Sequence, residues 1–117
     1  MNQNDPPTEH ILACLSSSPS NAKIVRTAAT MAKAFGGTFT ALYVRTPDSD
    51  QMGKEDCRRL QQHIRMAEQA GADISTIYGD DIPQQIAEFA RISGITKIVT
   101  GALQRTSPPF LEWTVTD

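Results

Sequence analysis

The sequence predicts a three-layer α/β domain with an open, parallel sheet. Predicted strands alternate with predicted helices four times along the chain, which implies a parallel sheet covered by helices on both faces. The first strand is the apolar run at residues 11–15 (Ile-Leu-Ala-Cys-Leu), which suits a strand that is buried on both faces. A length of 117 residues gives room for one hydrophobic core and none for a linked second domain.

The chain opens with a segment that carries no structural pattern. Residues 1–8 are polar and proline-rich, which is typical of a disordered lead-in, so we expect the folded domain over residues 9–117. Residues 9–44 then predict a strand, a tight loop, a helix and a second strand. In such a unit, the loop that joins the first strand to the helix is a natural place for an anion.

The first helix has recognisable start and stop signals. Ser18 can cap its amino end, Pro19 suits its first turn, and the glycine pair at 36–37 can end it in a left-handed turn. Apolar residues recur at steps of three, four and three and predict one buried stripe. They are Val25, Ala28, Ala32 and Phe35.

The rest of the chain repeats this alternation. A loop over 45–50 precedes a helix over 53–70, a strand over 73–78, a helix over 83–93 and a strand over 96–101. Asp80 or Asp81 can cap the third helix. The predicted inner stripe of the second helix is Cys57, Leu60, Ile64 and Ala67, and its arginines and His63 are expected to be solvated.

Composition and motifs exclude several functions. A net charge of -2 argues against nucleic-acid binding, and the two cysteines have no metal-like spacing, as expected of reduced thiols in the cytoplasm. The chain has no apolar run of about 18 residues, although it could be cut from a longer membrane protein. His10 and His63 belong to no catalytic motif, so we expect neither an enzyme nor a metal site.

Two loops are the candidate binding site. If the first and fourth strands are neighbours, the loop at 16–20 and the loop at 101–108 meet beyond their carboxyl ends, where open parallel sheets bind ligands. The first loop offers serine hydroxyls and helix amides to a phosphate, and the second offers Arg105, Thr106 and Ser107. Serines before a helix can also be simple caps, and both interpretations stay open.

Several segments resemble known proteins. The alternation of elements and the run 96–101 (Thr-Lys-Ile-Val-Thr-Gly) resemble the universal stress protein (Usp) superfamily. Residues 10–16, 21–23 and 39–44 look more narrowly like the Usp-like domain of KdpD-type sensor histidine kinases. The resemblance implies a Rossmann-like, adenine-nucleotide alpha hydrolase-like fold and a place in a two-component system for potassium homeostasis.

In some of these kinases the domain binds cyclic di-AMP through a signature of Ser-x-Ser, twenty residues, then Phe-Thr-Ala-x-Tyr. The chain matches it fully, with serines at 16–18 and Phe-Thr-Ala-Leu-Tyr at 39–43. The ligand-binding residues that the resemblance implies, together with the second loop, are Ser16, Ser18, Phe39, Thr40, Ala41, Tyr43, Gly101, Arg105 and Ser107.

Strand alternation gives the aromatic part of this signature a physical meaning. Phe39, Ala41 and Tyr43 share one face of the second strand, and Thr40 and Leu42 take the other. An aromatic at the carboxyl end of a strand can stack on a purine, and a small alanine leaves room for it. The alternative, in which Phe39 and Tyr43 fill the core, stays open.

Two departures from the family pattern matter. ATP-binding members carry Gly-x2-Gly-x9-Gly-Ser/Thr after the fourth strand, whereas Gly101 is followed here by Ala-Leu-Gln-Arg, which argues against ATP. The resemblance implies a sheet of order 3-2-1-4-5, and residues 112–117 look like the start of the family's last helix. We therefore expect the order 3-2-1-4 with strand five missing by truncation, and residues 108–117 folded back as a short helix or exchanged with a second copy.

The resulting hypothesis is a non-catalytic domain that senses cyclic di-AMP for signal transduction, on the cytoplasmic side of an inner-membrane sensor kinase. A generic adenine-nucleotide-binding stress protein and a pure interaction module are the alternatives. The expected partners are cyclic di-AMP and other domains of the parent kinase. A homodimer is left open, nucleic acid is excluded, and contact with the membrane would run only through the parent protein.

Overall fold

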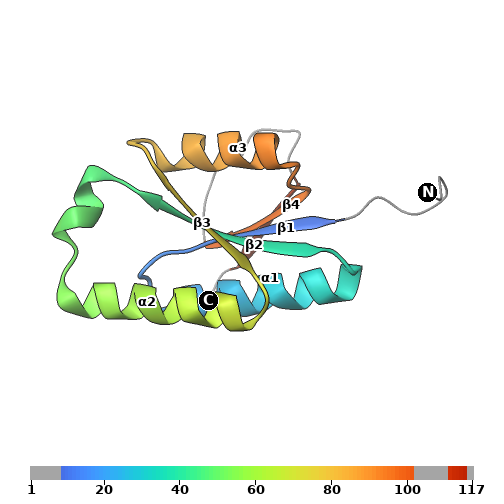
Figure 1. Ribbon diagram of the computed structural model, residues 1–117, viewed down its shortest axis with the longest axis horizontal. Helices are drawn as coiled ribbons and strands as arrows, with labels where there is room; N and C mark the ends of the chain where they lie inside the picture. Colours follow the sequence, from blue (N-terminus) through green and yellow to red (C-terminus); the bar gives the residue numbers. More distant parts are fainter. Residues whose placement is uncertain (1–8, 102–110, 116–117) are drawn as a thin grey trace.

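The computed structural model describes residues 9–101 and 111–115. Its elements are β1 (His10–Cys14), α1 (Asn21–Phe35), β2 (Thr38–Arg45), the 3-10 helix η1 (Pro47–Gln51), α2 (Lys54–Gln69), β3 (Asp73–Tyr78), α3 (Ile82–Ser93), β4 (Lys97–Gly101) and β5 (Leu111–Val115). The strands pair in parallel in the order β3-β2-β1-β4-β5. Helices α1 and α2 cover one face of the sheet and α3 covers the other (Figure 1). The predicted three-layer architecture is confirmed.

The outer strand next to β4 corrects one expectation. β5 pairs with β4 in parallel, from Lys97 opposite Leu111 to Gly101 opposite Val115. The expected loss of strand five, and a helix or an exchanged segment over 111–115, are therefore wrong. Residues 111–115 alternate apolar and polar side chains, as strands do, and their backbone satisfies groups that β4 would otherwise leave unpaired. Residues 102–110, which hold most of the loop predicted at 101–108 and the first part of the segment 108–117, lie outside the described residues.

The core has one cluster on each face of the sheet. Alternate residues of β2 divide between them, since Phe39 and Ala41 pack on the side of α1 and α2, and Leu42 and Val44 pack on the side of α3. This confirms the predicted alternation. From α1, the predicted stripe residues Val25, Ala28 and Ala32 are buried.

Phe35 is 47% exposed, so its predicted burial is wrong. Phe35 lies in the last turn of α1, and the ammonium group of Lys97 lies over its ring, 4.9 Å from the ring centre. Helix α1 ends at Gly36, whose φ of 66° is the left-handed conformation that glycine adopts most easily. The glycine stop predicted for this helix is confirmed.

The other helices follow the sequence closely. Asp81 caps α3 by accepting a hydrogen bond from the backbone N–H of Gln84 at 3.3 Å, as predicted for one of the two aspartates. In α2, the predicted inner residues Leu60 and Ala67 are buried, but Cys57 is exposed. Cys57 lies in the first turn of the helix, beside the segment that follows η1.

A polar cluster joins the strands at their amino ends. Glu9 Oε1 accepts hydrogen bonds from Thr96 Oγ1 at 2.7 Å and from Lys97 Nζ at 3.0 Å. The hydrogen bond from Thr96 and that from Lys97 hold the pKa of the Glu9 carboxyl below its usual value. His10 Nδ1 lies 2.6 Å from Thr38 Oγ1 on the neighbouring strand. Side-chain hydrogen bonds therefore link the amino ends of the strands, which we call the amino edge of the sheet.

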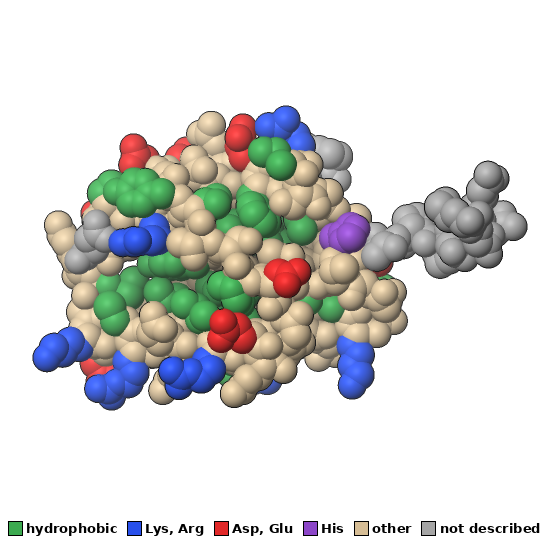
Figure 2. Space-filling view, in the orientation of Figure 1, with side chains coloured by type: hydrophobic (Ala, Val, Ile, Leu, Met, Phe, Trp, Pro, Cys, Tyr) green, Lys and Arg blue, Asp and Glu red, His purple; other side chains and the backbone are tan. Residues whose placement is uncertain are grey.

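The molecular surface reflects the layers. In Figure 2 hydrophobic side chains gather between the two helix layers, and lysines and arginines follow the outer side of the α1 and α2 layer. Within the part of the chain that the structure describes, no helix has the length and apolar character needed to cross a bilayer.

Candidate functional site

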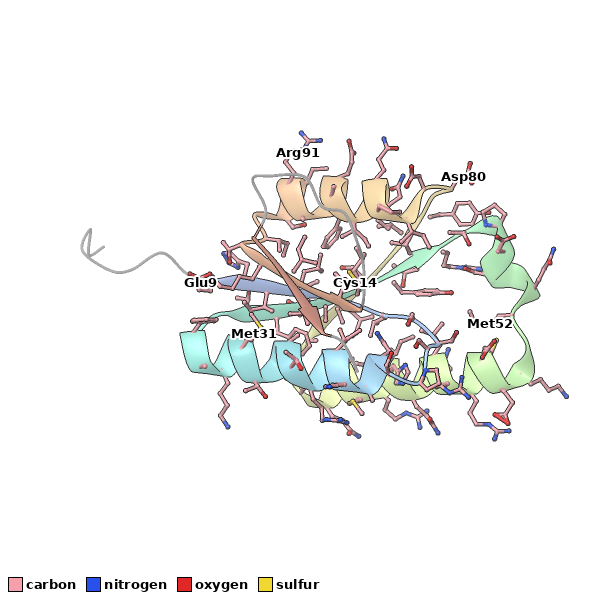
Figure 3. All side chains as sticks on the ribbon, turned by 180° about the vertical axis from the view of Figure 1, so that it is seen from behind. Glu9, Cys14, Met31, Met52, Asp80 and Arg91 are labelled. Atoms are coloured by element: carbon pink, nitrogen blue, oxygen red, sulfur yellow. The ribbon has the colours of Figure 1, made fainter. Side chains whose placement is uncertain are left out.

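A pocket of about 470 Å³ lies at the carboxyl edge of the sheet. We call it the serine pocket, because the loop between β1 and α1, residues 15–20, lines it with Ser16, Ser17, Ser18 and Ser20. Its other walls come from the ends of β1 and β2, the start of α1, η1 with the segment after it, and the first turns of α3. Figure 3 labels Cys14 and Met52, which line the pocket from β1 and from the segment after η1.

The loop owes its shape to Asn21, the first residue of α1. Asn21 is 1% exposed; its Oδ1 accepts from the backbone N–H of Ser16 at 3.1 Å and its Nδ2 donates to the carbonyl of Cys14 at 2.8 Å. The end of β1 and the start of α1 are thus bonded through one buried amide. A buried polar side chain with both ends satisfied fixes the path of the backbone around it.

The serine side chains do not cap helix α1. The residue before α1 is Ser20, and its side chain makes no capping hydrogen bond, so the prediction that Ser18 caps the helix is wrong. The carbonyl of Ser18 accepts from the N–H of Asn21 at 2.9 Å, and this turn shifts the helix start beyond Ser18. Ser18 Oγ lies 3.0 Å from Ser20 Oγ, and Ser16 Oγ accepts from the N–H of Ser18 at 3.2 Å. Both signature serines therefore face the pocket rim.

Helix α2 holds the same loop from the other side. His63, expected to be solvated, is only 4% exposed, so that prediction is wrong. Its Nδ1 donates to the carbonyl of Ser16 at 2.8 Å, since a carbonyl can only accept. Arg59 Nη1 donates to the carbonyl of Ser17 at 3.1 Å and to Asp56 Oδ1 at 3.2 Å.

A signal for this role was present in the sequence. Leu60, His63 and Ala67 follow one another at steps of three and four, which places the histidine on the buried face of α2. Sequence reasoning assigned His63 to the polar face because of its residue type. Its partner, a backbone carbonyl 47 positions away in the chain, leaves no mark in the sequence pattern.

The structure separates the predicted residues of β2. Tyr43 is half-buried and lines the serine pocket together with Ser16 and Ser18. Phe39 and Ala41 are buried in the core under α1 and α2. Thr40 is half-buried, and opposite it on the neighbouring strands lie Leu12 and Asp73.

The predicted second loop is only partly in view. Gly101 is the last residue of β4, which pairs with β1, so it lies at the same edge of the sheet as the serine pocket. Arg105 and Ser107 lie outside the described residues. Across those described, no group of three or more histidine, cysteine, aspartate or glutamate side chains is arranged to hold a metal ion.

A second pocket, of about 340 Å³, adjoins the serine pocket and was not foreseen. We call it the side pocket. It shares Tyr43, Ser49 and Met52 with the serine pocket, so the two pockets adjoin one another at these residues. Its remaining lining residues come from β2, α2 and β3: Arg45, Cys57, Leu60, Gln61, Ile64 and Thr76. The backbone N–H of Thr46 donates to Ser49 Oγ at 3.0 Å, which fixes the turn between the two pockets.

This fold, with a pocket at the carboxyl ends of the strands where β2 and β4 flank β1 on opposite sides, is that of an open, parallel α/β domain with its candidate site at the topological switch point. The sequence profile of the Universal stress protein family matches residues 7–110, and the chain belongs to this family. A universal stress protein in complex with cAMP superposes with a TM-score of 0.70 at 14% identity, covering 94% of this chain and 98% of that one.

More narrowly, the chain is a universal stress protein domain of the KdpD type. It is 36% identical over 110 residues to the sensor protein KdpD of Clostridium acetobutylicum, covering 94% of this chain and 12% of that protein. It is 29% identical over 91 residues to KdpD of Escherichia coli K12, covering 78% of this chain and 10% of that protein. The chain thus spans about a tenth of the length of these relatives.

Proposed function

We propose that this domain senses cyclic di-AMP and passes the signal to a potassium-responsive sensor histidine kinase, without catalysing a reaction itself. The observation that carries the proposal is the meeting of Ser16, Ser18 and Tyr43 in the serine pocket. These residues lie at the two ends of the signature, on different elements. The pocket combines polar groups suited to phosphate with an aromatic ring suited to a base.

The serine loop supplies the phosphate contacts. Hydroxyls of Ser16 and Ser18 can donate to phosphate oxygens, and the loop leads into the amino end of α1, where the helix dipole favours an anion. The backbone N–H groups of Ser16, Ser18 and Asn21 are already bonded within the loop, so the serine hydroxyls are the groups that we assign to the ligand. We assign the phosphates to this rim.

Tyr43 and its apolar neighbours supply the base contacts. Ile24, Val44 and Ile86 are buried and line the pocket, and Ile82 and Met52 lie at its opening. Stacking of a base on an aromatic side chain is worth roughly 1–3 kcal/mol in proteins that bind single strands. A purine beside the Tyr43 ring would gain this stacking and bury apolar surface as well.

The side pocket favours a ligand with two bases. It adjoins the serine pocket at Tyr43, and it offers Gln61 and Thr76 as polar partners for the edge of a second base. A cyclic dinucleotide can reach both pockets, whereas one purine mononucleotide fills only one. Binding of a mononucleotide is the second candidate function, because a universal stress protein of the same fold is known in complex with cAMP.

Calorimetric titration with cyclic di-AMP, cyclic di-GMP, cAMP and ATP tests the proposal. We expect saturable binding of cyclic di-AMP and weaker binding of the others. Tighter binding of cAMP or ATP would favour the second candidate function. Absence of heat with all four nucleotides would contradict both and leave an interaction module.

Two native thiols report on the two pockets separately. Cys14 lines the serine pocket and Cys57 lines the side pocket. Alkylation rates followed by mass spectrometry should fall at both thiols with cyclic di-AMP, and at Cys14 alone with cAMP. Protection of Cys57 by cAMP to the same degree would contradict the assignment of one base to each pocket.

A further inference from the structure

Helix α2 presents two hydrogen-bond donors to consecutive carbonyls of the serine loop. His63 Nδ1 lies 2.8 Å from the carbonyl of Ser16, and Arg59 Nη1 lies 3.1 Å from that of Ser17. We propose that His63 and Arg59 are positioning residues, which hold the serine loop in the conformation that receives the phosphates of the ligand. The proposal rests on the proposed function for the identity of that ligand.

The direction of these bonds matters for an anion. The serine pocket is lined by β1 and its loop, α1, β2, the η1 segment and α3, while the two donors come from α2. Carbonyls that are bonded to α2 point toward that helix and not toward the ligand. A carbonyl oxygen facing a phosphate would repel it, so engaging both carbonyls elsewhere leaves the serine hydroxyls on the pocket side.

The loop is thereby fixed from two directions. Asn21 of α1 binds the N–H of Ser16, and His63 of α2 binds the carbonyl of the same residue. Both side chains are at least nine-tenths buried, so neither bond competes with bulk water. A loop ordered before binding does not have to be ordered by the ligand, and its affinity is higher for that reason.

His63 and Arg59 are not equivalent. His63 is buried, and its Nδ1 carries the hydrogen because its partner, the carbonyl of Ser16, can only accept. The Arg59 side chain is 32% exposed and divides its donors between Ser17 and Asp56. Loss of the His63 bond should therefore affect the loop more than loss of the Arg59 bond.

The test uses the whole chain and variants of α2. His63→Leu removes the donor, and His63→Asn keeps a donor near the position of Nδ1. Arg59→Gln shortens the side chain that donates to the carbonyl of Ser17, so this second hydrogen bond is lost. Arg58→Gln is the control for charge, because Arg58 is the adjacent arginine and is exposed. Ala67→Gly is the control for stability, because Ala67 is buried in α2, its methyl group donates no hydrogen bond to the serine loop, and glycine weakens a helix.

Hydrogen exchange of the ligand-free protein is the first measurement. We expect the N–H groups of Ser16 and Ser18 to exchange faster in His63→Leu and Arg59→Gln, and to stay unchanged in the two controls and nearly so in His63→Asn. Unchanged exchange in both His63→Leu and Arg59→Gln would overturn the proposal. This result does not depend on the ligand, so it stands even where the proposed function fails.

Affinity for cyclic di-AMP is the second measurement. His63→Leu should weaken binding about five- to tenfold, the loss expected of one hydrogen bond, with partial rescue by His63→Asn. Ala67→Gly, which lowers the melting temperature without touching the loop, should bind as the wild type does. Equal weakening by Ala67→Gly and His63→Leu would show a general loss of stability and overturn the positioning role.

Discussion

Each residue of the signature has its own surroundings. Ser16 and Ser18 line the rim of the serine pocket, Tyr43 stands between that pocket and the side pocket, and Phe39 is 6% exposed in the core. The signature therefore combines residues that line a pocket with a residue that supports the strand below it. Substitutions at these positions should separate binding from stability.

The serines should affect binding with little effect on stability. Ser16→Ala or Ser18→Ala should weaken cyclic di-AMP binding by about 0.5–1.5 kcal/mol for a neutral hydrogen bond, and by up to about 3 kcal/mol for one to a charged oxygen. Calorimetry measures the loss, and the exposed Ser93→Ala at the end of α3 is the control. Wild-type affinity in the double alanine variant would exclude the two serines as phosphate contacts.

Tyr43 should act through its ring. Tyr43→Phe should keep most of the affinity, because stacking needs only the aromatic face, whereas Tyr43→Ala should lose roughly 1–3 kcal/mol of binding energy. The two variants are compared by titration under identical conditions. If Phe and Ala are equally poor, the hydroxyl is the group that matters and stacking is not the cause.

Phe39 should act through packing. Phe39→Leu keeps an apolar side chain in the core, so it should lower the free energy of unfolding and leave cyclic di-AMP affinity unchanged. Phe39→Ala should lower the free energy of unfolding by about 3–5 kcal/mol, which is a large part of the stability of a small domain. Urea denaturation and titration of the same samples separate the two effects. A stable Phe39→Leu variant with lost affinity would show that Phe39 contacts the ligand.

At the scale of elements, the amino edge of the sheet is tied by Glu9, which bridges to Thr96 and Lys97 at the start of β4. Since its pKa is lower in the folded protein than in the unfolded chain, Glu9 stabilises the fold above its unfolded pKa. This stabilisation is lost as the pH falls through the lower, folded pKa. Acid should therefore loosen this edge.

Glu9→Gln gives the test. Its melting temperature should be below that of the wild type at pH 7, and the difference should shrink as the pH is lowered through the folded pKa. Glu88→Gln is the matched control, because the Glu88 pair with Arg91 is exposed on α3 and surface pairs contribute little. A difference between Glu9→Gln and wild type that persists unchanged at low pH would show that the carboxylate charge is not the cause.

Periodicity was enough to predict the first four strands, the three α-helices and their order along the chain. Glycine at 36 and aspartate at 81 marked helix ends correctly because these residues suit specific backbone geometries. Contacts between distant segments could not be predicted. The burial of His63 depends on the carbonyl of Ser16, and the helix start at Asn21 depends on β1. β5 was missed because residues 108–117 were expected to form a short helix or to be exchanged with a second copy, and its pairing with β4 is a tertiary contact.

At the scale of the whole molecule, the two edges of the sheet differ. The amino edge is closed by the Glu9 cluster, and the carboxyl edge carries the serine pocket and the side pocket. A ligand at the carboxyl edge would join the serine loop, β2, the η1 segment and α3, which come from distant parts of the chain. Binding should therefore stabilise the domain as a unit.

Thermal unfolding measures this stabilisation. At a cyclic di-AMP concentration 100 times the Kd, binding to the folded state alone adds about 2.7 kcal/mol, so the melting temperature should rise with ligand concentration. The double variant Ser16→Ala, Ser18→Ala should need more ligand for the same rise. A melting temperature that does not change with saturating ligand would contradict binding to the folded domain.

The most direct test of the central claim is a titration of the isotope-labelled domain with cyclic di-AMP, followed residue by residue by NMR. With cyclic di-AMP we expect the largest chemical-shift changes at Ser16–Ser18 and Tyr43 in the serine pocket and at Gln61 and Thr76 in the side pocket. With cAMP we expect changes at the serine-pocket residues only. Shifts confined to other surfaces, or none at saturating ligand, would contradict a cyclic di-AMP site between these two pockets.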